Sequence, residues 1–436
     1  MKEQKLYTKY NNYFKEALDF LNKESREGKD IPEKPEEEIE FKVKKEIFGR
    51  SVEYKFIHVL KKDYFLFISN KWDLLKNLKS YKICLKYLND NKYIKDYIEE
   101  QDFLLDPIQT FAESTKGFKF AKDEIDKIYN KIEDFIFSKS IKFSCSARLS
   151  GFESDADEIN IDEFTKIKKY SEAECKELWR RSSFIRSSIG IISPLDYRLE
   201  IIFNKNKEDL RRYAGEGQDE LNKALLLLRL FKSSTLRTGI IETKAIQWIP
   251  FSGIASSGLE EKLGGSYKLT KDEVPALIRL WNVIKNITYL NCPSLEIAIH
   301  RFNFAHERYN LEDRLIDIMI GFEALYLDDD KELRYKSAIR TAILIGKTLE
   351  DRKRIFKMML SAYDQRSNLV HGGKLDQKVK IAYPVSQEFD INAFIDAIKN
   401  YLSISIKTFA YLSAIYTHKQ ILDKIHQSTL VAGIAL

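Results

Sequence analysis

The stretch YDQRSNLVHGG, residues 363–373, decides how the last third of this chain is interpreted. It closes a run in which apolar residues recur at steps of three and four, the pattern of one buried helix face. Position 366 should continue that face but holds Arg366. A buried guanidinium is costly unless paired, so this position predicts a carboxylate, a partner subunit or a phosphate beside the arginine. The apolar members of the run are Ile355, Met358, Met359, Ala362, Tyr363, Leu369 and Val370.

The end of the same segment combines a histidine with two glycines. Gly372 and Gly373 are residues that commonly end a helix, which places His371 at the helix C-terminus. Histidine is the side chain best suited to proton transfer near neutral pH. Five residues along an ideal helix correspond to about 140° of rotation. Arg366 and His371 therefore converge only if the last turn is distorted or if the long arginine side chain reaches round.

Two further charges stand in apolar helical sequence. Glu323 lies in IDIMIGFEALYL, and Arg340 lies in LRYKSAIRTAILIG. One interpretation is structural: Glu323 forms a buried ion pair with Arg340 or with Arg366 and fixes the register of the helices. Such a pair is also open to Arg366, and the alternative for that residue is a functional site shared with His371.

The spacing R-x(4–6)-H is a weak signal by itself. In a chain of this composition it arises by chance about once, and it occurs twice, at Arg366 with His371 and at Arg301 with His306. The first pair interrupts an apolar stripe and stands before two glycines, whereas the second lies in the middle of a helical segment. We expect Arg301 and His306 to be ordinary residues of a helix surface.

Before about residue 270, strand-like runs alternate with helical sequence. Helices are expected at 1–25, over most of 72–135, and in QDELNKALLLLRLFKSS. This part predicts a mixed α/β region with an antiparallel sheet, which divides into two subdomains near residue 136. The strand-like runs are IEFKVKKEIF (39–48), VEYKFIHVL (52–60), YFLFIS (64–69), IKFSCSARL (141–149), YRLEIIFN (197–204) and TGIIETKAIQWIPF (238–251).

After residue 270 the strand signals nearly vanish. The segment 271–436 predicts an all-α bundle of roughly one domain's size. The whole chain is therefore expected to be α+β, with a sensor or regulatory region at 1–270 and the helical domain behind it. The helices are expected at 271–288, 294–309, 311–327, 332–347, 351–371 and 391–425.

Composition sets broad limits on the class of protein. The chain has 436 residues with a net charge of +6, a mild bias that permits an anionic partner without demanding one. No window of about 20 apolar residues appears, and the N-terminus lacks an apolar run of signal-peptide type, so we expect a cytoplasmic protein without a membrane span. The cysteines do not have metal-ligand spacing and are expected to be reduced thiols: Cys84, Cys145, Cys175 and Cys292.

The C-terminal part resembles an Apea-like HEPN domain, a helical bundle of the HEPN ribonuclease superfamily. The resemblance rests on LEDRLIDIMIGFEALYL (311–327), LRYKSAIRTAILIG (333–346) and YDQRSNLVHGG (363–373). In order, these are an acidic helix with a central glutamate, a helix with an arginine, and a helix that ends R-S-x-x-x-H-G. The last block is the most specific, and the resemblance covers roughly 271–430.

The resemblance implies a two-fold homodimer in which the motifs of both subunits form one composite site that cleaves RNA. Arg366 and His371 occupy the motif positions, with Glu323 and Arg340 in support. Many HEPN ribonucleases carry Asn, Asp or His directly after the motif arginine. This chain has Ser367 there and Asn368 one step later.

The implied chemistry suits these residue types. The 2′-OH of RNA is the nucleophile, histidine moves protons, and arginine holds the phosphate and stabilises its charge. The expected products are a 2′,3′-cyclic phosphate and a 5′-hydroxyl, and neither a metal nor a cofactor is required.

Two functions follow from the resemblance. The first is an endoribonuclease in bacterial antiphage defence or toxicity, with residues 1–270 responding to a trigger or regulator, for example one of phage origin. The second is a non-catalytic scaffold, in which the helical domain dimerises and Arg366 and His371 bind a nucleotide or RNA without cleaving it. The cue for the scaffold is Ser367 in the position of the polar helper.

Overall fold

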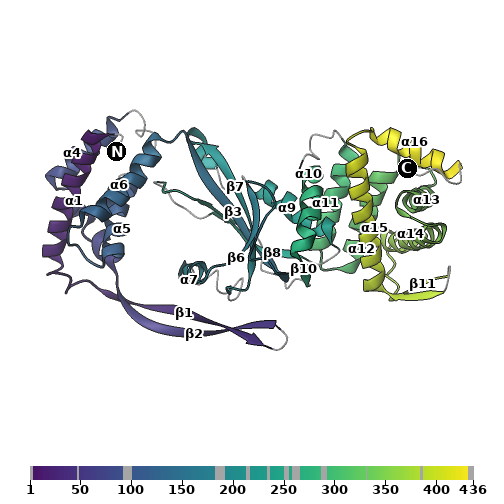
Figure 1. Cartoon of the computed structure of the whole chain (residues 1–436), viewed down its shortest axis with the longest axis horizontal. Helices are drawn as coiled ribbons and strands as arrows, with labels where there is room; N and C mark the ends of the chain where they lie inside the picture. The colour runs from purple at the N-terminus through teal and green to yellow at the C-terminus, as the bar shows by residue number, and fades with distance from the viewer. Residues whose placement is uncertain are drawn as a thin grey trace. The chain divides into compact units, whose positions relative to one another are not determined.

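The protein is described by a computed structural model, shown in Figure 1. Its contacts divide the chain into two compact units, which are described separately here. Unit 1 comprises Met1–Ala147, Lys169–Gln218 and Ile240–Glu260, and unit 2 comprises Arg148–Lys168, Asp219–Gly239 and Glu261–Leu436. The structure describes residues 3–46, 49–91, 101–181, 192–212, 217–232, 236–249, 255–257, 266–285, 292–329, 331–382 and 386–430.

A helical cluster with an aromatic core forms the first part of unit 1 (Figure 1). The expected helix at 1–25 is α1 (Gln4–Glu24), and it packs against α4 (Lys79–Asn89), α5 (Asp106–Thr115) and α6 (Lys122–Phe137). A short π-helix, η1 (Gln101–Leu105), leads into α5. The apolar residues of the long helices recur at helical spacing, so one face of each is buried. The largest buried side chains of this core include Tyr10, Tyr13, Phe14, Phe103, Phe111, Tyr129 and Phe135.

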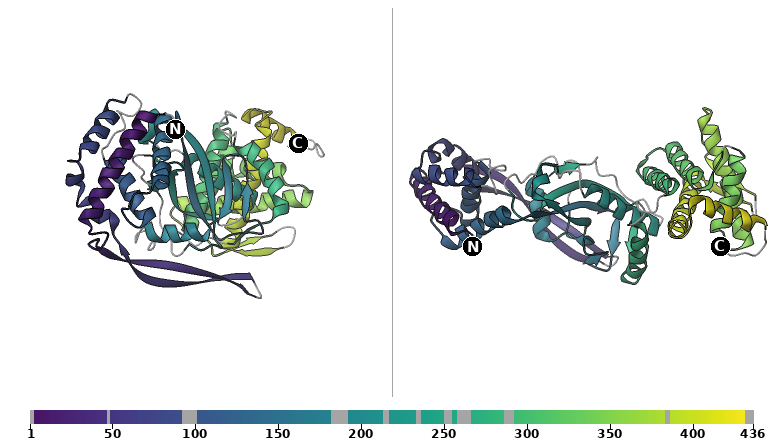
Figure 2. Two further views of the ribbon diagram at one scale, coloured as in Figure 1. Left: turned by 60° about the vertical axis from the view of Figure 1, so that its left-hand side comes forward. Right: turned by 90° about the horizontal axis from the view of Figure 1, so that it is seen from above.

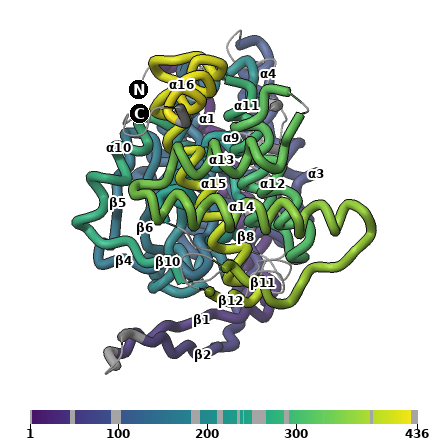
Figure 3. The backbone as a smooth tube through the Cα atoms, turned by 90° about the vertical axis from the view of Figure 1, so that its right-hand side faces the viewer, coloured from purple at the N-terminus to yellow at the C-terminus, as the bar shows by residue number. Residues whose placement is uncertain are grey.

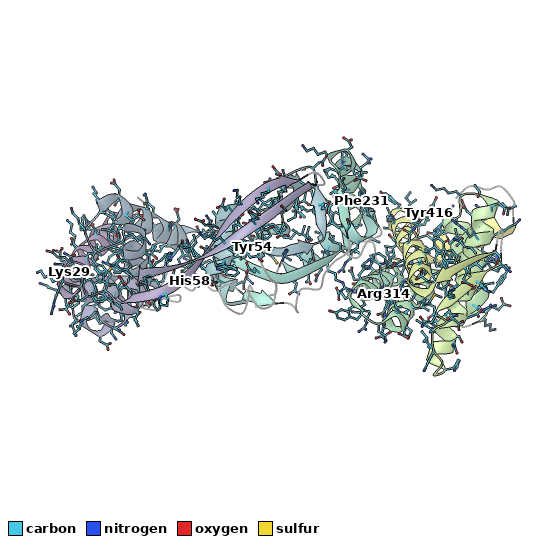
Figure 4. The ribbon with its side chains drawn as sticks, turned by 90° about the horizontal axis from the view of Figure 1, so that it is seen from below. Lys29, Tyr54, His58, Phe231, Arg314 and Tyr416 are labelled. Carbon is cyan, nitrogen blue, oxygen red and sulfur yellow. The ribbon has the colours of Figure 1, made fainter. Side chains whose placement is uncertain are left out.

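The first two expected strands are confirmed as a long hairpin, β1 (Glu33–Glu46) and β2 (Gly49–Lys62). Its two strands form an extended ribbon in both views of Figure 2, and Tyr54 and His58 are labelled on it in Figure 4. Ile39 pairs with Phe56 across the antiparallel ladder. The helix α7 (Glu172–Arg181) packs against β1.

The third expected strand, YFLFIS, is wrong: these residues form the helix α2 (Tyr64–Ser69), followed by α3 (Trp72–Leu75). The side chain of Asp63 caps α2 by accepting a hydrogen bond from the backbone N–H of Leu66 at 2.9 Å. Tyr64, Phe67 and Ile68 are buried, which is helical spacing and not strand alternation. A short apolar run fits a strand as well as a helix, whereas the capping residue Asp63 indicates a helix.

The remaining expected strands of the N-terminal part are present. They are β3 (Ser140–Ser150), β7 (Tyr197–Asn206) and β8 (Arg237–Ala245), in the order β7-β3-β8-β9, with β9 at Ala255–Ser257. β8 and β9 pair antiparallel, and the 3-10 helix η2 (Lys207–Arg212) follows β7. The last strand was expected to reach residue 251 but ends at Ala245, and residues 250–251 lie outside the described part.

Unit 2 has a small β component of its own. The strands β5 (Glu158–Asn160) and β6 (Thr165–Lys169) pair antiparallel, whereas β4 (Phe152–Ser154) and β10 (Tyr267–Leu269) pair parallel. The helix expected in QDELNKALLLLRLFKSS is confirmed as α9 (Gln218–Phe231).

The C-terminal helices of unit 2 surround α12 (Leu311–Tyr326), which packs against four others. Gly321 is part of this packing, because a side chain at that position would come within 2.9 Å of Leu402. The 3-10 turn η3 (Lys271–Glu273) precedes them. The helices are α10 (Val274–Ile284), α11 (Pro293–Glu307), α13 (Leu333–Ile345), α14 (Leu349–Val370), α15 (Ile391–Leu412) and α16 (His418–Leu430).

Two expectations for the C-terminal part are corrected. The helix expected at 391–425 is two helices, because Thr417 and Gln420 exchange hydrogen bonds at a new helix start. The part is also not entirely helical, since β11 (Lys378–Ile381) and β12 (Gln387–Asp390) form an antiparallel hairpin. The mixed α+β class is confirmed. The assignment of a regulatory region to 1–270 and a HEPN-like domain to 271–436 stays a prediction.

No helix in the described ranges has the length and apolar character needed to cross a bilayer.

Candidate functional site

The helix α14 carries the candidate motif and lies beside α13 and α15 in Figure 3. It begins at Thr348, whose side chain accepts a hydrogen bond from the backbone N–H of Asp351. Its buried face runs through Ile355, Met358, Met359, Ala362 and Gln365.

The buried face of α14 therefore passes through Gln365, and not through position 366 as expected. The Gln365 side chain is held by Asp376, whose backbone N–H donates to its Oε1 at 3.0 Å. Arg366 consequently lies at the edge of the buried face, with 23% of its side chain exposed.

The carboxylate beside Arg366 belongs to Glu323 of α12. Nη2 of Arg366 lies 3.4 Å from Oε2 of Glu323, whose side chain is 21% exposed. Nε of Arg366 and Oε1 of Glu323 are buried and have no hydrogen-bond partner in the described part of the protein. One long contact thus joins two half-buried charges, and each charge keeps an unsatisfied atom.

The electrostatics of Glu323 show which effect is larger at this pair. Burial raises the pKa of the Glu323 carboxyl above its ordinary value, and the positive charge of Arg366 opposes that rise. The net direction is upward, so the loss of hydration outweighs the attraction of the guanidinium.

Arg340 does not contact Glu323. Its Nη1 donates to the backbone carbonyl of Tyr326 and lies 2.8 Å from Oδ1 of Asp328. The arginine therefore satisfies a free carbonyl at the C-terminus of α12, a structural role. Of the two pairings open to Glu323, the structure contains the one with Arg366.

The expected helix stop at the glycines is confirmed. Gly372 has φ +85°, the left-handed conformation that favours glycine. Its N–H donates to the carbonyl of Leu369 at 3.0 Å, and the N–H of Gly373 donates to that of Asn368 at 2.9 Å. This is a Schellman motif, and it places His371 at the C-cap with an exposed side chain.

Asn368 braces the turn behind His371. Its Nδ2 donates to the carbonyl of Lys374 at 2.7 Å. A side chain at Gly373 would come within 2.0 Å of Oδ1 of Asn368, so the turn closes tightly over the asparagine. Ser367 is half-buried, and its backbone carbonyl accepts from the N–H of His371 at 3.2 Å.

The structure thus brings some of the expected site residues together and separates others. Arg366 and Glu323 are in contact, and Ser367 and Asn368 join the backbone around His371. The guanidinium of Arg366 faces α12, whereas the His371 side chain is exposed at the helix end, and the described contacts of the two include none between them.

The second R-x4-H pair is not a helix-surface pair, contrary to expectation. His306 is 4% exposed, and its Nδ1 lies 2.9 Å from the carbonyl oxygen of Phe302. Burial, and next the charge of Arg229, lowers its pKa well below the ordinary histidine value. Arg301 binds Asp317 at 2.8 Å.

A periodicity count could have located His306 in the interior. The buried face of α11 contains Leu295, Ala298, Ile299, Phe302 and Ala305, and His306 follows Phe302 by four residues. The sequence interpretation considered only the mid-helix position of the pair and not this apolar face.

Among the residues described, no group of three or more His, Cys, Asp or Glu side chains could hold a metal ion. Comparison of the chain with protein-family models, with curated proteins and with solved structures finds no match.

Proposed function

We propose that this protein is a metal-independent endoribonuclease whose site is formed by Arg366 and His371 at a homodimer interface. The observation that carries the proposal is the incomplete pairing of Arg366. Its guanidinium is half-buried, meets one carboxylate at 3.4 Å and leaves a buried Nε without a partner. A phosphate oxygen accepts strong charge-assisted hydrogen bonds from such a group.

The position of His371 supports the same function. The side chain projects from the C-cap of α14 into solvent and is open to a substrate. Histidine can remove the proton of a ribose 2′-OH or protonate the departing 5′ oxygen. Attack of the 2′ oxygen on the adjacent phosphorus breaks the bond to the 5′ oxygen and leaves a 2′,3′-cyclic phosphate and a 5′-hydroxyl.

The separation of the two side chains within one chain supports the homodimer. Arg366 faces Glu323 and His371 lies at the helix end, and in the proposed dimer a second subunit supplies the complementary group. Val370 lies next to the histidine with 56% of its surface exposed. An exposed apolar residue at the motif is consistent with an interface there.

The direct test uses the purified full chain, RNA substrates and a chelator of divalent metals. We expect the parent to cleave and the Arg366→Ala and His371→Ala variants to lose about 100-fold or more in rate. Matched controls are Arg354→Ala, an exposed arginine of the same helix, and His58→Ala, an exposed histidine of unit 1. Intact RNA with the parent, or cleavage by both site variants at the parental rate, would refute the proposal.

We also propose a role in antiphage defence or toxicity, with residues 1–270 as the part that responds to a trigger. Expression of the parent and of the Arg366→Ala/His371→Ala form in growing cells, with and without phage, tests it. The parent should reduce growth or degrade total RNA under the triggering condition, and the double variant should do neither.

The scaffold is the alternative, and one observation favours it. Glu323 already supplies a carboxylate to Arg366, so the arginine has a structural partner in the monomer. RNA or nucleotide binding without turnover in the cleavage assay would select the scaffold.

A further inference from the structure

A cavity of about 570 Å³ lies in unit 2 among α9, α10 and α11, away from the α14 motif. Its size is in the range of sites for small molecules. Five apolar side chains line the cavity; Phe304 is 43% exposed and the other four are buried. The apolar residues are Leu225, Leu226, Ile284, Ile299 and Phe304.

The lining from the C-terminal halves of α9 and α11 includes a buried cation, Arg229. Its side chain is 3% exposed, Nε donates to the carbonyl of Leu236, and Nη1 donates to Oδ1 of Asn303 at 3.0 Å. Its carboxylate neighbour, Glu307, is 3.5 Å away and 59% exposed, so the pair is long and partly in solvent. Burial lowers the pKa of Arg229 to about 10, which leaves the guanidinium charged at neutral pH.

Other cations reinforce the positive potential behind Arg229. The pKa of the neighbouring His306 is lowered by burial and then by the charges of Arg229, Lys399 and Arg314. Asp396 accepts from Lys399 at 2.8 Å and offsets part of this charge. An anionic group that reaches Arg229 would therefore enter a favourable potential.

The lining from the first turns of α9 and α11, which we call the mouth, has the opposite sign. Asp219 and Glu220 stand in the first turn of α9, and Glu296 stands in the first turn of α11. Glu220 is paired with Lys223 at 2.6 Å, whereas no described residue forms an ion pair with Asp219 or Glu296. Carboxylates in first turns also stabilise their helices, but here they face one opening together.

We propose that this cavity binds a short peptide with free termini, because Asp219 and Arg229 are ten residues apart on α9, about 15 Å along the helix, which is farther than the two charged groups of a single amino acid reach. The carboxylate of the ligand binds Arg229 and Asn303, its ammonium group lies among the carboxylates of the mouth, and an apolar side chain packs on the leucines and isoleucines. The inference is independent of the ribonuclease proposal, because the two sites share no residue.

Titration calorimetry of the full chain tests the proposal with a small set of ligands. The probes are leucyl-phenylalanine, phenylalanyl-leucine and leucyl-leucyl-phenylalanine, each compared with its C-terminal amide and its N-acetyl form. We expect at least one free zwitterion to bind, and both blocked forms of that ligand to bind at least tenfold more weakly. The proposal would be overturned if no probe bound at ~10 mM, the weak end of specific affinity, or if either blocked form bound as tightly as the free ligand.

Variants at the mouth keep the test independent of the buried arginine. The Asp219→Asn/Glu296→Gln form should weaken the free ligand at least threefold and leave the N-acetyl form unchanged. Asp423→Asn, an exposed carboxylate of α16, is the matched control and should bind as the parent does. Equal affinity of the parent and the mouth variant for the free ligand would contradict the assignment of the ammonium group.

Discussion

At Glu323, the carboxylate beside Arg366 of α14, the loss of hydration on burial outweighs the attraction of the guanidinium. The pKa of Glu323 is raised despite the adjacent guanidinium, and each partner retains a buried atom without a hydrogen bond. Half-buried ion pairs of this kind contribute little to stability. In the proposed function, Arg366 exchanges this carboxylate for a phosphate.

The sequence allowed part of this arrangement to be predicted. A charge on the apolar stripe of a helix requires a partner, and Glu323 was one of the carboxylates available to Arg366. The deviation of the buried face to Gln365 could not be predicted, because it depends on Asp376 beyond the end of the helix. Arg340 was expected beside the site, but it binds the end of α12.

His306 predicts a specific pH dependence of stability. Its folded pKa is depressed, so the unfolded chain binds a proton below a pH of about 6.5 that the folded chain does not bind. Stability is therefore present above that pH and is lost as the pH falls. Between pH 7.5 and 5.5 we expect His306→Leu to lose about 1.4 kcal/mol less free energy of unfolding than the parent.

Urea denaturation at several pH values measures this difference. The test compares how the free energy of unfolding changes with pH. A His306→Leu variant that is less stable than the parent at every pH therefore still gives a valid comparison. Parallel curves for the two proteins would contradict the neutral, buried state of His306.

At the scale of elements, the quality of local signals decided which predictions held. The helix α1 and the two strands of the β1–β2 hairpin have long, regular periodicity and were predicted, although β1 begins at Glu33, six residues before the expected strand. YFLFIS was predicted wrongly, since five apolar residues and a serine fit either structure and the cap at Asp63 was overlooked. The break before α16 had a comparable signal in the Thr417 and Gln420 capping box.

The end of α14 gives an element-scale prediction about Gly372. An L-residue at its φ of +85° is strained, although a Cβ there would meet no atom within 4 Å. We expect Gly372→Ala to lower the stability of unit 2 by about 1 kcal/mol through backbone strain alone. Gly117→Ala is the control, because that glycine also has open space but no positive φ.

Thermal and urea unfolding with a probe of unit 2 measure the effect. A Gly372→Ala variant as stable as the parent would show that α14 does not end in the Schellman motif.

At the scale of the whole molecule, the α+β class was predictable and the grouping of segments was not. Composition and periodicity separate a strand-containing first part from a mainly helical second part. Residues 148–168 and 219–239 nevertheless belong to the same compact unit as the C-terminal helices. Such grouping arises from contacts between distant segments, which a single sequence does not encode in local patterns.

The proposed dimer gives a prediction at this scale. Val370→Asp places a charge on an exposed apolar residue beside the motif and should shift the chain from dimer to monomer, with loss of cleavage. Ile415→Asp is the control, since Ile415 is 74% exposed after α15 and should leave the dimer intact. Sedimentation equilibrium measures both, and a dimeric Val370→Asp form would place the interface elsewhere.

In the proposed mechanism, Arg366 and His371 promote attack of a ribose 2′-OH on the adjacent phosphate. The most direct measurement follows one RNA with a defined cleavage position, and the same RNA with 2′-deoxyribose at that position, in the presence of a metal chelator. We predict a 2′,3′-cyclic phosphate and a 5′-hydroxyl from the first RNA and no cut at the substituted position in the second. Cleavage of the 2′-deoxy substrate at an equal rate, or a product with a 5′-phosphate, would contradict the account.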